Sequence, residues 1–155
     1  MITGNPEILL IEDSEYEAEL TFKALAARMP AVRYSHLREG KEALQYLFNE
    51  GIYENQSYSL PLLIILDLDL PRMKGLEVLK AIKADPRTRS IPVIIVTVST
   101  SEQEMKQAYL LGANSFVIKP LNFVKFSLVI ADIANYWLLV NDLPNYAKPS
   151  QGGLF

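Results

Sequence analysis

Short apolar runs alternate along the chain with segments in which apolar residues recur at helical spacing. Each apolar run ends at a polar or turn-forming residue, which is the pattern of strands buried inside a sheet. The strands predicted in this way span residues 8–11, 31–35, 62–66, 92–96 and 115–118. The helices predicted between and after them span about 14–29, 40–48, 76–83, 101–111 and 123–140.

Five strand–helix units in succession predict an α/β protein whose parallel sheet carries helices on both faces. Because parallel crossovers are right-handed, the units should form a doubly wound (βα)5 sandwich. The flavodoxin-like strand order 2-1-3-4-5 is one common solution, and its switch point lies between strands one and three. We expect a single domain over residues 1–142, followed by a flexible C-terminal tail over 143–155.

The composition fits one such domain and narrows its partners. Of the 155 residues, 50% are hydrophobic and 21% are charged, so a well-packed core is expected. The formal net charge of −3, without a Lys/Arg cluster, argues against nucleic-acid binding. There is no cysteine, the single His36 has no partner for a metal site, and the N-terminus lacks a basic leader. No continuous apolar run reaches the roughly 18–20 residues that span a bilayer, so we expect a cytoplasmic protein.

Polar side chains follow four of the predicted strands at their carboxyl ends. They are Glu12 and Asp13 after strand one, Asp67 after strand three, Thr97 after strand four and Lys119 after strand five. Each alone has an ordinary explanation as a helix-start acid, a loop acid or a surface charge. Together they bring three carboxylates to the switch point, where a hard cation such as Mg²⁺ would relieve their repulsion. The hydroxyl and the ammonium group on the far side suit the oxygens of a phosphoryl group.

Four segments carry a resemblance to the receiver domain of two-component response regulators. They are ILLIEDS (8–14), LIILDLDLPRMKG (63–75), IPVIIVTVS (91–99) and ANSFVIKP (113–120). The resemblance implies that Asp67 accepts a phosphoryl group from the phosphohistidine of a sensor histidine kinase. It also implies that Mg²⁺ (or Mn²⁺) binds to Glu12, Asp13, Asp67 and the backbone carbonyl of Asp69. Such a protein assists its own phosphorylation and dephosphorylation and is not an enzyme with a separate substrate.

The same resemblance implies a switch at the other two strand ends. Thr97, the backbone of Val98 and Lys119 would contact the phosphoryl oxygens, while Phe116 would be the switch aromatic that moves inward. The switched surface would comprise helix four, strand five and helix five. The Lys119–Pro120 bond is expected to be cis, as in the family.

Small departures from the family pattern concern access to the phosphoryl group and its lifetime. Val98 is larger than the usual Ala or Gly, and Phe116 lacks the hydroxyl of the more frequent Tyr. Asp69 and Ser99 occupy the two positions that tune phosphoryl lifetime in the family. None of these departures removes a required group.

The last predicted helix has more apolar residues than one buried face requires. Ile130, Ile133 and Trp137 can face the sheet. The residues that remain for a second apolar face are Phe126, Tyr136, Leu139 and Val140. Exposed apolar patches mark interfaces, so a homodimer or partner contact is expected there, unless the tail from Asn141 folds back over it.

The loop over 50–60 and the ending YWLLVNDLP resemble stand-alone regulators that pair with bacterial, especially cyanobacterial, phytochrome kinases and dimerise through this face. Three alternatives remain open. Asp67-Leu68-Asp69 after an apolar strand also occurs in haloacid-dehalogenase-type phosphatases, but there the motif follows the first strand. A flavin-binding flavodoxin would need a first loop that cradles phosphate, which Glu12-Asp13-Ser14 does not provide. The third alternative is a receiver-like binding module that works without phosphorylation.

Overall fold

Five parallel strands form the central sheet of the protein, which the computed structural model describes over residues 5–143. The strands are β1 (Ile8–Ile11), β2 (Tyr34–Leu37), β3 (Leu63–Leu66), β4 (Val93–Thr97) and β5 (Ser115–Ile118). Their order across the sheet is β2-β1-β3-β4-β5, and every neighbouring pair is parallel. The predicted fold class and strand order are therefore confirmed, and β1 and β3 lie side by side at the switch point.

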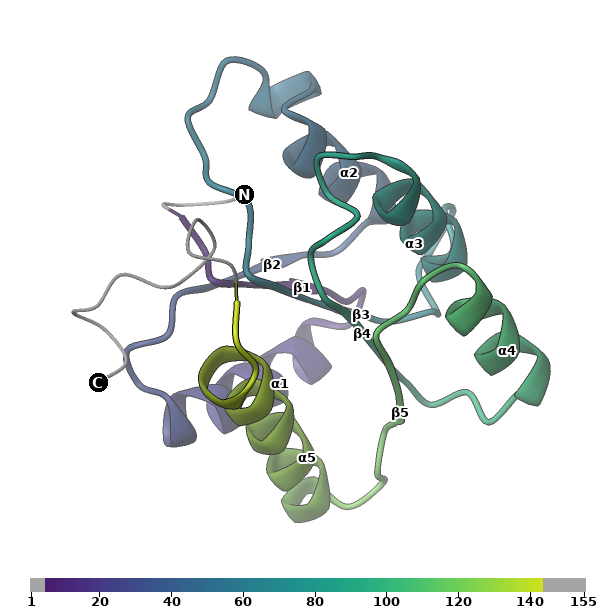
Figure 1. The fold of residues 1–155 in the computed structure, drawn as a ribbon. Coiled ribbons are helices and arrows are strands. Elements are labelled where there is room, and N and C mark those ends of the chain that lie inside the picture. The colour runs from purple at the N-terminus through teal and green to yellow at the C-terminus, as the bar shows by residue number, and fades with distance from the viewer. Residues whose placement is uncertain (1–4, 144–155) are drawn as a thin grey trace.

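Helices cover both faces of the sheet (Figure 1). One face carries α1 (Glu15–Arg28) and α5 (Phe123–Asn135), and the other carries α2 (Gly40–Phe48), α3 (Gly75–Ala84) and α4 (Glu102–Leu110). The helices begin where the sequence favours an N-terminus. For example, the Ser14 and Ser101 hydroxyl oxygens accept hydrogen bonds from the third residue of α1 and α4.

The strand residues divide the core into two layers. Leu9 and Ile11 pack with α2 and α3, whereas the alternating Ile8 and Leu10 pack with α1 and α5. Since successive side chains of a strand point to opposite faces, a sheet covered on both sides needs apolar residues at every position. This requirement explains why the strands read as continuous apolar runs.

Strand β2 begins three residues later than the apolar content of 31–35 predicts. The N–H of Arg33 donates to the Glu7 carboxylate at 3.0 Å, so it is not available to the sheet. Val32 is buried as part of the turn that follows α1, where its N–H donates to the carbonyl of Met29. The ladder with β1 therefore starts at Tyr34.

The predicted last helix over 123–140 is divided into two parts. The α-helix α5 ends at Asn135 and continues as a π-helical turn, η2 (Tyr136–Val140). The assignment of Phe126 to the exposed apolar face is wrong, because its side chain is only 6% exposed. Phe126 shares its helix face with Ile130 and Ile133, four and seven residues on, and packs with them against the sheet.

The segment Phe123–Val140 also meets the length and composition of a membrane-crossing helix. Its apolar stretch is interrupted by Lys125 and Asp132, which is why no continuous run appears in the sequence. Ile130 and Ala134 of this helix are completely buried against the sheet. In this fold, the helix therefore forms one wall of the core. The predicted tail lies, from residue 144 onward, outside the described residues.

The loop over 50–60 contains more structure than its composition predicts. A short 3-10 turn, η1 (Gly51–Tyr53), places Tyr53 in the core, and its hydroxyl donates to Glu42 at 2.7 Å. The rings of Tyr46 and Tyr58 lie against it, with centroids 5.5 and 6.1 Å away. These three tyrosines fasten the loop to α2.

Candidate functional site

The carboxyl ends of β1, β3, β4 and β5 bring four of the predicted site residues to one buried place. Glu12, Asp67, Thr97 and Lys119 are all buried, although each carries a polar or charged group. Buried charges are retained in proteins when they are paired or bind a ligand. This edge of the sheet is therefore the candidate site.

The Lys119 ammonium group is the centre of the site. It donates to Glu12 Oε2 at 2.8 Å, to Asp67 Oδ2 at 3.0 Å and to Glu17 Oε2 at 2.6 Å. The first two carboxylates come from the ends of β1 and β3, and the third comes from the first turn of α1. One ammonium group thus holds three carboxylates whose oxygens lie within 4.8 Å of one another.

The Asp67 carboxylate is oriented at both oxygens. Oδ2 accepts from Lys119, while Oδ1 accepts the backbone N–H of Asp69 at 3.1 Å. The Asp69 side chain is exposed and lies outside the group of carboxylates around Lys119. Its backbone N–H orients Asp67, while its side chain is directed to solvent.

Charge balance determines the protonation of this group. Burial raises the pKa of Glu12 to about 7, and the hydrogen bond from Lys119 offsets part of that rise. Burial alone would lower the pKa of Lys119, but its hydrogen bonds to Glu12 and Glu17 outweigh burial and raise that pKa above its ordinary value. Lys119 is therefore charged at neutral pH, and a proton on Glu12 or a metal cation offsets part or all of the negative charge that Lys119 leaves unpaired.

The residues proposed for the switch lie around this centre in a resting arrangement. The buried Thr97 hydroxyl oxygen accepts the N–H of Ser99 at 3.2 Å, and the Ser99 hydroxyl donates to Glu104 at 2.5 Å. Val98 is exposed, and Phe116 is half-buried against the core layer that contains α2 and α3. The Thr97 oxygen is thus bonded to the β4–α4 loop, while its hydroxyl hydrogen remains available to donate to a phosphoryl oxygen.

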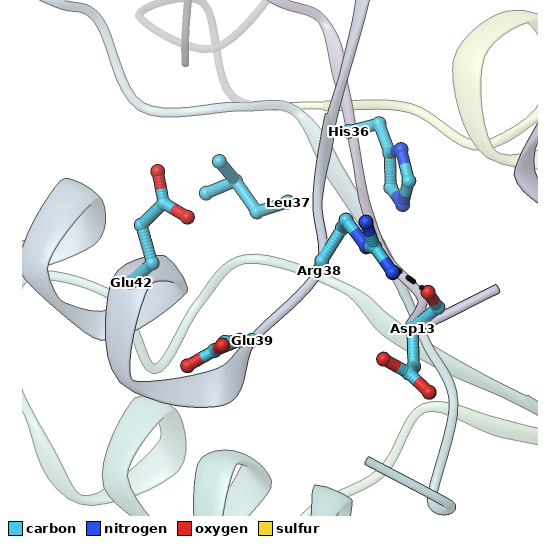
Figure 2. A pocket seen from close by; sticks show the side chains of 6 residues that line it. All are labelled: Asp13, His36, Leu37, Arg38, Glu39 and Glu42. Carbon is cyan, nitrogen blue, oxygen red and sulfur yellow. Dashed lines mark hydrogen bonds between the residues drawn. The ribbon is translucent and has the colours of Figure 1, made fainter. Parts of the chain in front are cut away.

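Asp13 lies beside the carboxylate group and not within it. Arg38 donates from Nε to the Asp13 backbone carbonyl at 3.2 Å, as Figure 2 shows. The Asp13 side chain lines a neighbouring pocket of about 400 Å³. The other residues that line this pocket are His36, Leu37, Arg38, Glu39 and Glu42. Metal binding by Asp13 stays a prediction.

The expected cis bond between Lys119 and Pro120 is not found, since residues 5–143 contain no cis peptide bond. The trans isomer is the more stable form of a bond before proline. In this arrangement the Lys119 N–H donates to the carbonyl of Thr97 at 2.7 Å.

The oxygen donors of the site suit a hard divalent cation. Glu12 and Asp67 are buried, their oxygens lie close together, and burial already disfavours the charge on Glu12. Mg²⁺ and Mn²⁺ prefer carboxylate and carbonyl ligands of this kind. The residues present therefore fit the predicted metal.

Glu17 is the member of the site that the sequence pattern did not reveal. The spacing from Ser14 indicates a capping box, in which Glu17 would bond back to the Ser14 N–H. In the structure the Ser14 N–H donates to Glu12 Oε1, and the Glu17 carboxylate is free to reach Lys119. The signal that could have found it is its position in the first turn of the helix that begins directly after the end of β1.

His36 makes a hydrogen bond to the end of β1 that could not be predicted from the sequence. Its Nε2 lies 2.6 Å from the backbone carbonyl of Glu12, and because a carbonyl oxygen only accepts, Nε2 is the donor. The contact fixes the backbone at the end of β1. His36 is not a member of the group of possible metal ligands among the described residues.

Gly75 sets the position of the Asp67 loop. A Cβ atom at residue 75 would lie 2.4 Å from the backbone oxygen of Asp67 and 2.6 Å from the Cα of Leu68. Because these are backbone atoms, the loop would have to move. We expect Gly75→Ala to lower the free energy of unfolding by about 1–3 kcal/mol, measured by urea denaturation.

A suitable control is Lys80→Ala, at an exposed position of the same helix, which we expect to change stability by less than about 0.5 kcal/mol. Equal stability of Gly75→Ala and Lys80→Ala would show that the loop accommodates the added methyl group.

Comparisons with known proteins agree with the fold. The profile of the response regulator receiver domain matches residues 8–131. A probable methanogenesis regulatory protein, FilR2 of Methanothrix harundinacea, is 41% identical over 140 residues, which are 90% of this chain and 88% of that protein. Response regulator Rcp1 of Synechocystis is 35% identical over 137 residues, which are 88% of this chain and 92% of that protein.

Solved structures give the same result. The phosphorylated cyanobacterial phytochrome response regulator RcpA superposes with a TM-score of 0.85 at 35% identity, over 92% of this chain and all of that chain. The Mn²⁺-bound form of Rcp1 superposes with a TM-score of 0.81 at 35% identity, over 88% of this chain and 97% of that chain. The receiver profile covers most of the chain, and both relatives are matched over most of their length. The chain therefore belongs to the family of response regulator receiver domains.

Proposed function

We propose that this protein is a single-domain response regulator that accepts a phosphoryl group on Asp67 from a sensor histidine kinase. The observation that carries this proposal is the buried Asp67 carboxylate at the switch point, held by Lys119 at 3.0 Å. An oxygen nucleophile in that place has a cation beside it for the incoming negative charge.

Glu12 and Asp67 would hold Mg²⁺ (or Mn²⁺), together with Asp13 and the backbone carbonyl of Asp69. When bound, the cation would neutralise charge on the phosphoryl oxygens and position them for in-line attack. The chain's own contribution is to orient the Asp67 carboxylate through the hydrogen bonds from Lys119 and the Asp69 N–H.

Phosphorylation converts the Asp67 carboxylate to an acyl phosphate and adds roughly one negative charge. Lys119 and Thr97 respond with charge-assisted hydrogen bonds, and the backbone of Val98 follows Thr97. Because the N–H of Ser99 donates to the Thr97 hydroxyl oxygen, the β4–α4 loop moves with Thr97 toward the site. Phe116 turns inward into the space that this movement opens, which changes the surface of α4, β5 and α5.

Side chains at the loop ends would set the phosphoryl lifetime. Asp69 is exposed two residues after Asp67, where its carboxylate would affect the approach of water. Ser99 is tied to Glu104, so its position resists the movement of Thr97. The protein acts in this way on its own acyl phosphate and has no separate turnover substrate.

The partner is a histidine kinase in the cytoplasm, and a phytochrome is the candidate suggested by similarity to RcpA and Rcp1. FilR2, a relative at higher identity, has a name that points to methanogenesis regulation. The kinase pairing can be tested by phosphotransfer from a phosphorylated phytochrome kinase to this protein.

The exposed apolar residues of η2 are proposed as a homodimer surface. Tyr136, Leu139 and Val140 are exposed next to the buried Leu138, so the turn presents an apolar face to solvent. We expect Leu139→Glu to raise the dimer dissociation constant by about tenfold or more, because the interface would bury an unpaired charge. Sedimentation velocity over a protein concentration series measures this change.

The control is Ile52→Glu, which adds the same charge at an exposed apolar position of η1. A dimer that both variants leave intact would place the interface elsewhere, and a wild-type protein that is monomeric with and without phosphorylation would contradict the homodimer.

The proposed function is tested by incubating the protein with acetyl phosphate in Mg²⁺ and in EDTA. We expect the intact mass to increase by one phosphoryl group in Mg²⁺ alone. No gain in mass, together with no response to beryllofluoride, would support a binding module that works without phosphorylation.

A further inference from the structure

Lys119 has no free donor in the resting site. An ammonium group carries three N–H bonds, and the three are directed at Glu12, Asp67 and Glu17. A phosphoryl group on Asp67 takes over the N–H that served the Asp67 carboxylate. A second N–H of Lys119 can reach it only if Glu12 or Glu17 leaves. The identity of that acceptor determines how easily the phosphorylated state forms.

Burial distinguishes the three acceptors. The side chains of Glu12 and Asp67 are 6% and 7% exposed, whereas that of Glu17 is 36% exposed. Glu12 is held further by the Ser14 N–H, and Asp67 carries the reacting oxygen. Because an exposed carboxylate is solvated at once when its ion pair breaks, Glu17 is the acceptor that costs least to release.

We propose that the Glu17 carboxylate competes with the phosphoryl group for the Lys119 ammonium group and thereby stabilises the unphosphorylated state. This inference rests on the proposed function of Asp67. Glu17 lies in the first turn of α1 and can turn toward solvent without moving the helix, since its N–H remains bonded to Ser14 Oγ. It is a regulatory residue that acts through Lys119 and does not touch the reacting atoms.

The test compares the affinity for beryllofluoride, at saturating Mg²⁺, of wild type and Glu17→Gln. We expect the dissociation constant to fall about three- to tenfold in the variant, since a neutral amide competes weakly for an ammonium group. Glu17→Asp keeps the charge but shortens the side chain by one methylene group, so the 2.6 Å contact is lost. We expect it to tighten binding as well.

Glu19→Gln is the matched control, because it removes one negative charge from the same helix at a residue paired with Lys23. Equal tightening in Glu19→Gln, or wild-type affinity in Glu17→Asp, would overturn the inference in favour of a general charge effect. The Mg²⁺ affinity is measured separately without beryllofluoride. Weaker Mg²⁺ binding by Glu17→Gln, without tighter beryllofluoride binding, would show that Glu17 is instead a metal ligand.

The two proposals fail in different ways. If wild type takes up a phosphoryl group and Glu17→Gln binds beryllofluoride no more tightly, the function stands and the competition by Glu17 is contradicted. If wild type neither takes up a phosphoryl group nor binds beryllofluoride, the function itself is wrong, and the inference falls with it.

Discussion

Replacing Asp67 with Asn should abolish phosphoryl incorporation completely. The amide has the shape of the carboxylate but only one oxygen, so it keeps the hydrogen bond from the Asp69 N–H and loses the one from Lys119. Lys119 keeps its bonds to Glu12 and Glu17, so the fold should be retained. The amide lacks the anionic oxygen that attacks phosphorus. Intact mass after incubation with acetyl phosphate and Mg²⁺ measures the loss, and circular dichroism confirms that the variant is folded.

Asp132→Asn provides the control for this experiment, because Asp132 is an exposed acid on α5 that is not among the carboxylates around Lys119. It should gain the same mass as wild type. A mass gain in Asp67→Asn would place the acceptor on another group, with Glu12 the nearest candidate by its contact with Lys119. That result would contradict the assignment of Asp67.

The strand ends of the site could be predicted because each rests on a strong local signal. The apolar runs before Glu12, Asp67 and Thr97 are interrupted by the first polar residue, which marks the carboxyl end of a buried strand. Parallel pairing then brings these ends to one edge of the sheet. Four of the five strand-end residues consequently lie together around the carboxylate group.

Features that depend on side-chain direction could not be predicted in the same way. Glu17 can cap its helix or reach across to Lys119, and the sequence contains no information on which bond is made. Asp13 follows Glu12 directly, yet its side chain lines the neighbouring pocket. Phe126 belongs to a helix that is apolar on several sides, so its burial is determined by packing against the sheet.

Replacing Lys119 with Met should destabilise the metal-free protein strongly. The side chains of Lys119, Glu12 and Asp67 are 8%, 6% and 7% exposed, so the variant leaves buried carboxylates without their cation. Removing one partner of a buried ion pair costs about 3–5 kcal/mol. We expect a loss of that size in the free energy of unfolding, measured with urea in EDTA at about pH 7.5.

The loss of unfolding free energy in Lys119→Met should be larger near neutral pH than near pH 5. Burial raises the pKa of Glu12 from 4.5 to about 7, so the native state binds the extra proton in that interval. Stability therefore falls as the pH rises from 4.5 to 7. Lys119 lowers the pKa of Glu12, so its removal raises that pKa further and extends the fall to higher pH. The variant should be most impaired near neutral pH and should recover part of its stability near pH 5.

Mg²⁺ should raise the free energy of unfolding of Lys119→Met more than that of wild type. The reason is that the cation replaces the missing positive charge among the carboxylates. Lys80→Met, which removes an exposed charge from α3, controls for the change in net charge. If Lys119→Met unfolds in EDTA at the same urea concentration as Lys80→Met and shows no added response to Mg²⁺, the carboxylates do not depend on Lys119. In that case the ammonium group would not be the centre of the site, and neither the resting arrangement of Asp67 nor the competition by Glu17 could be correct.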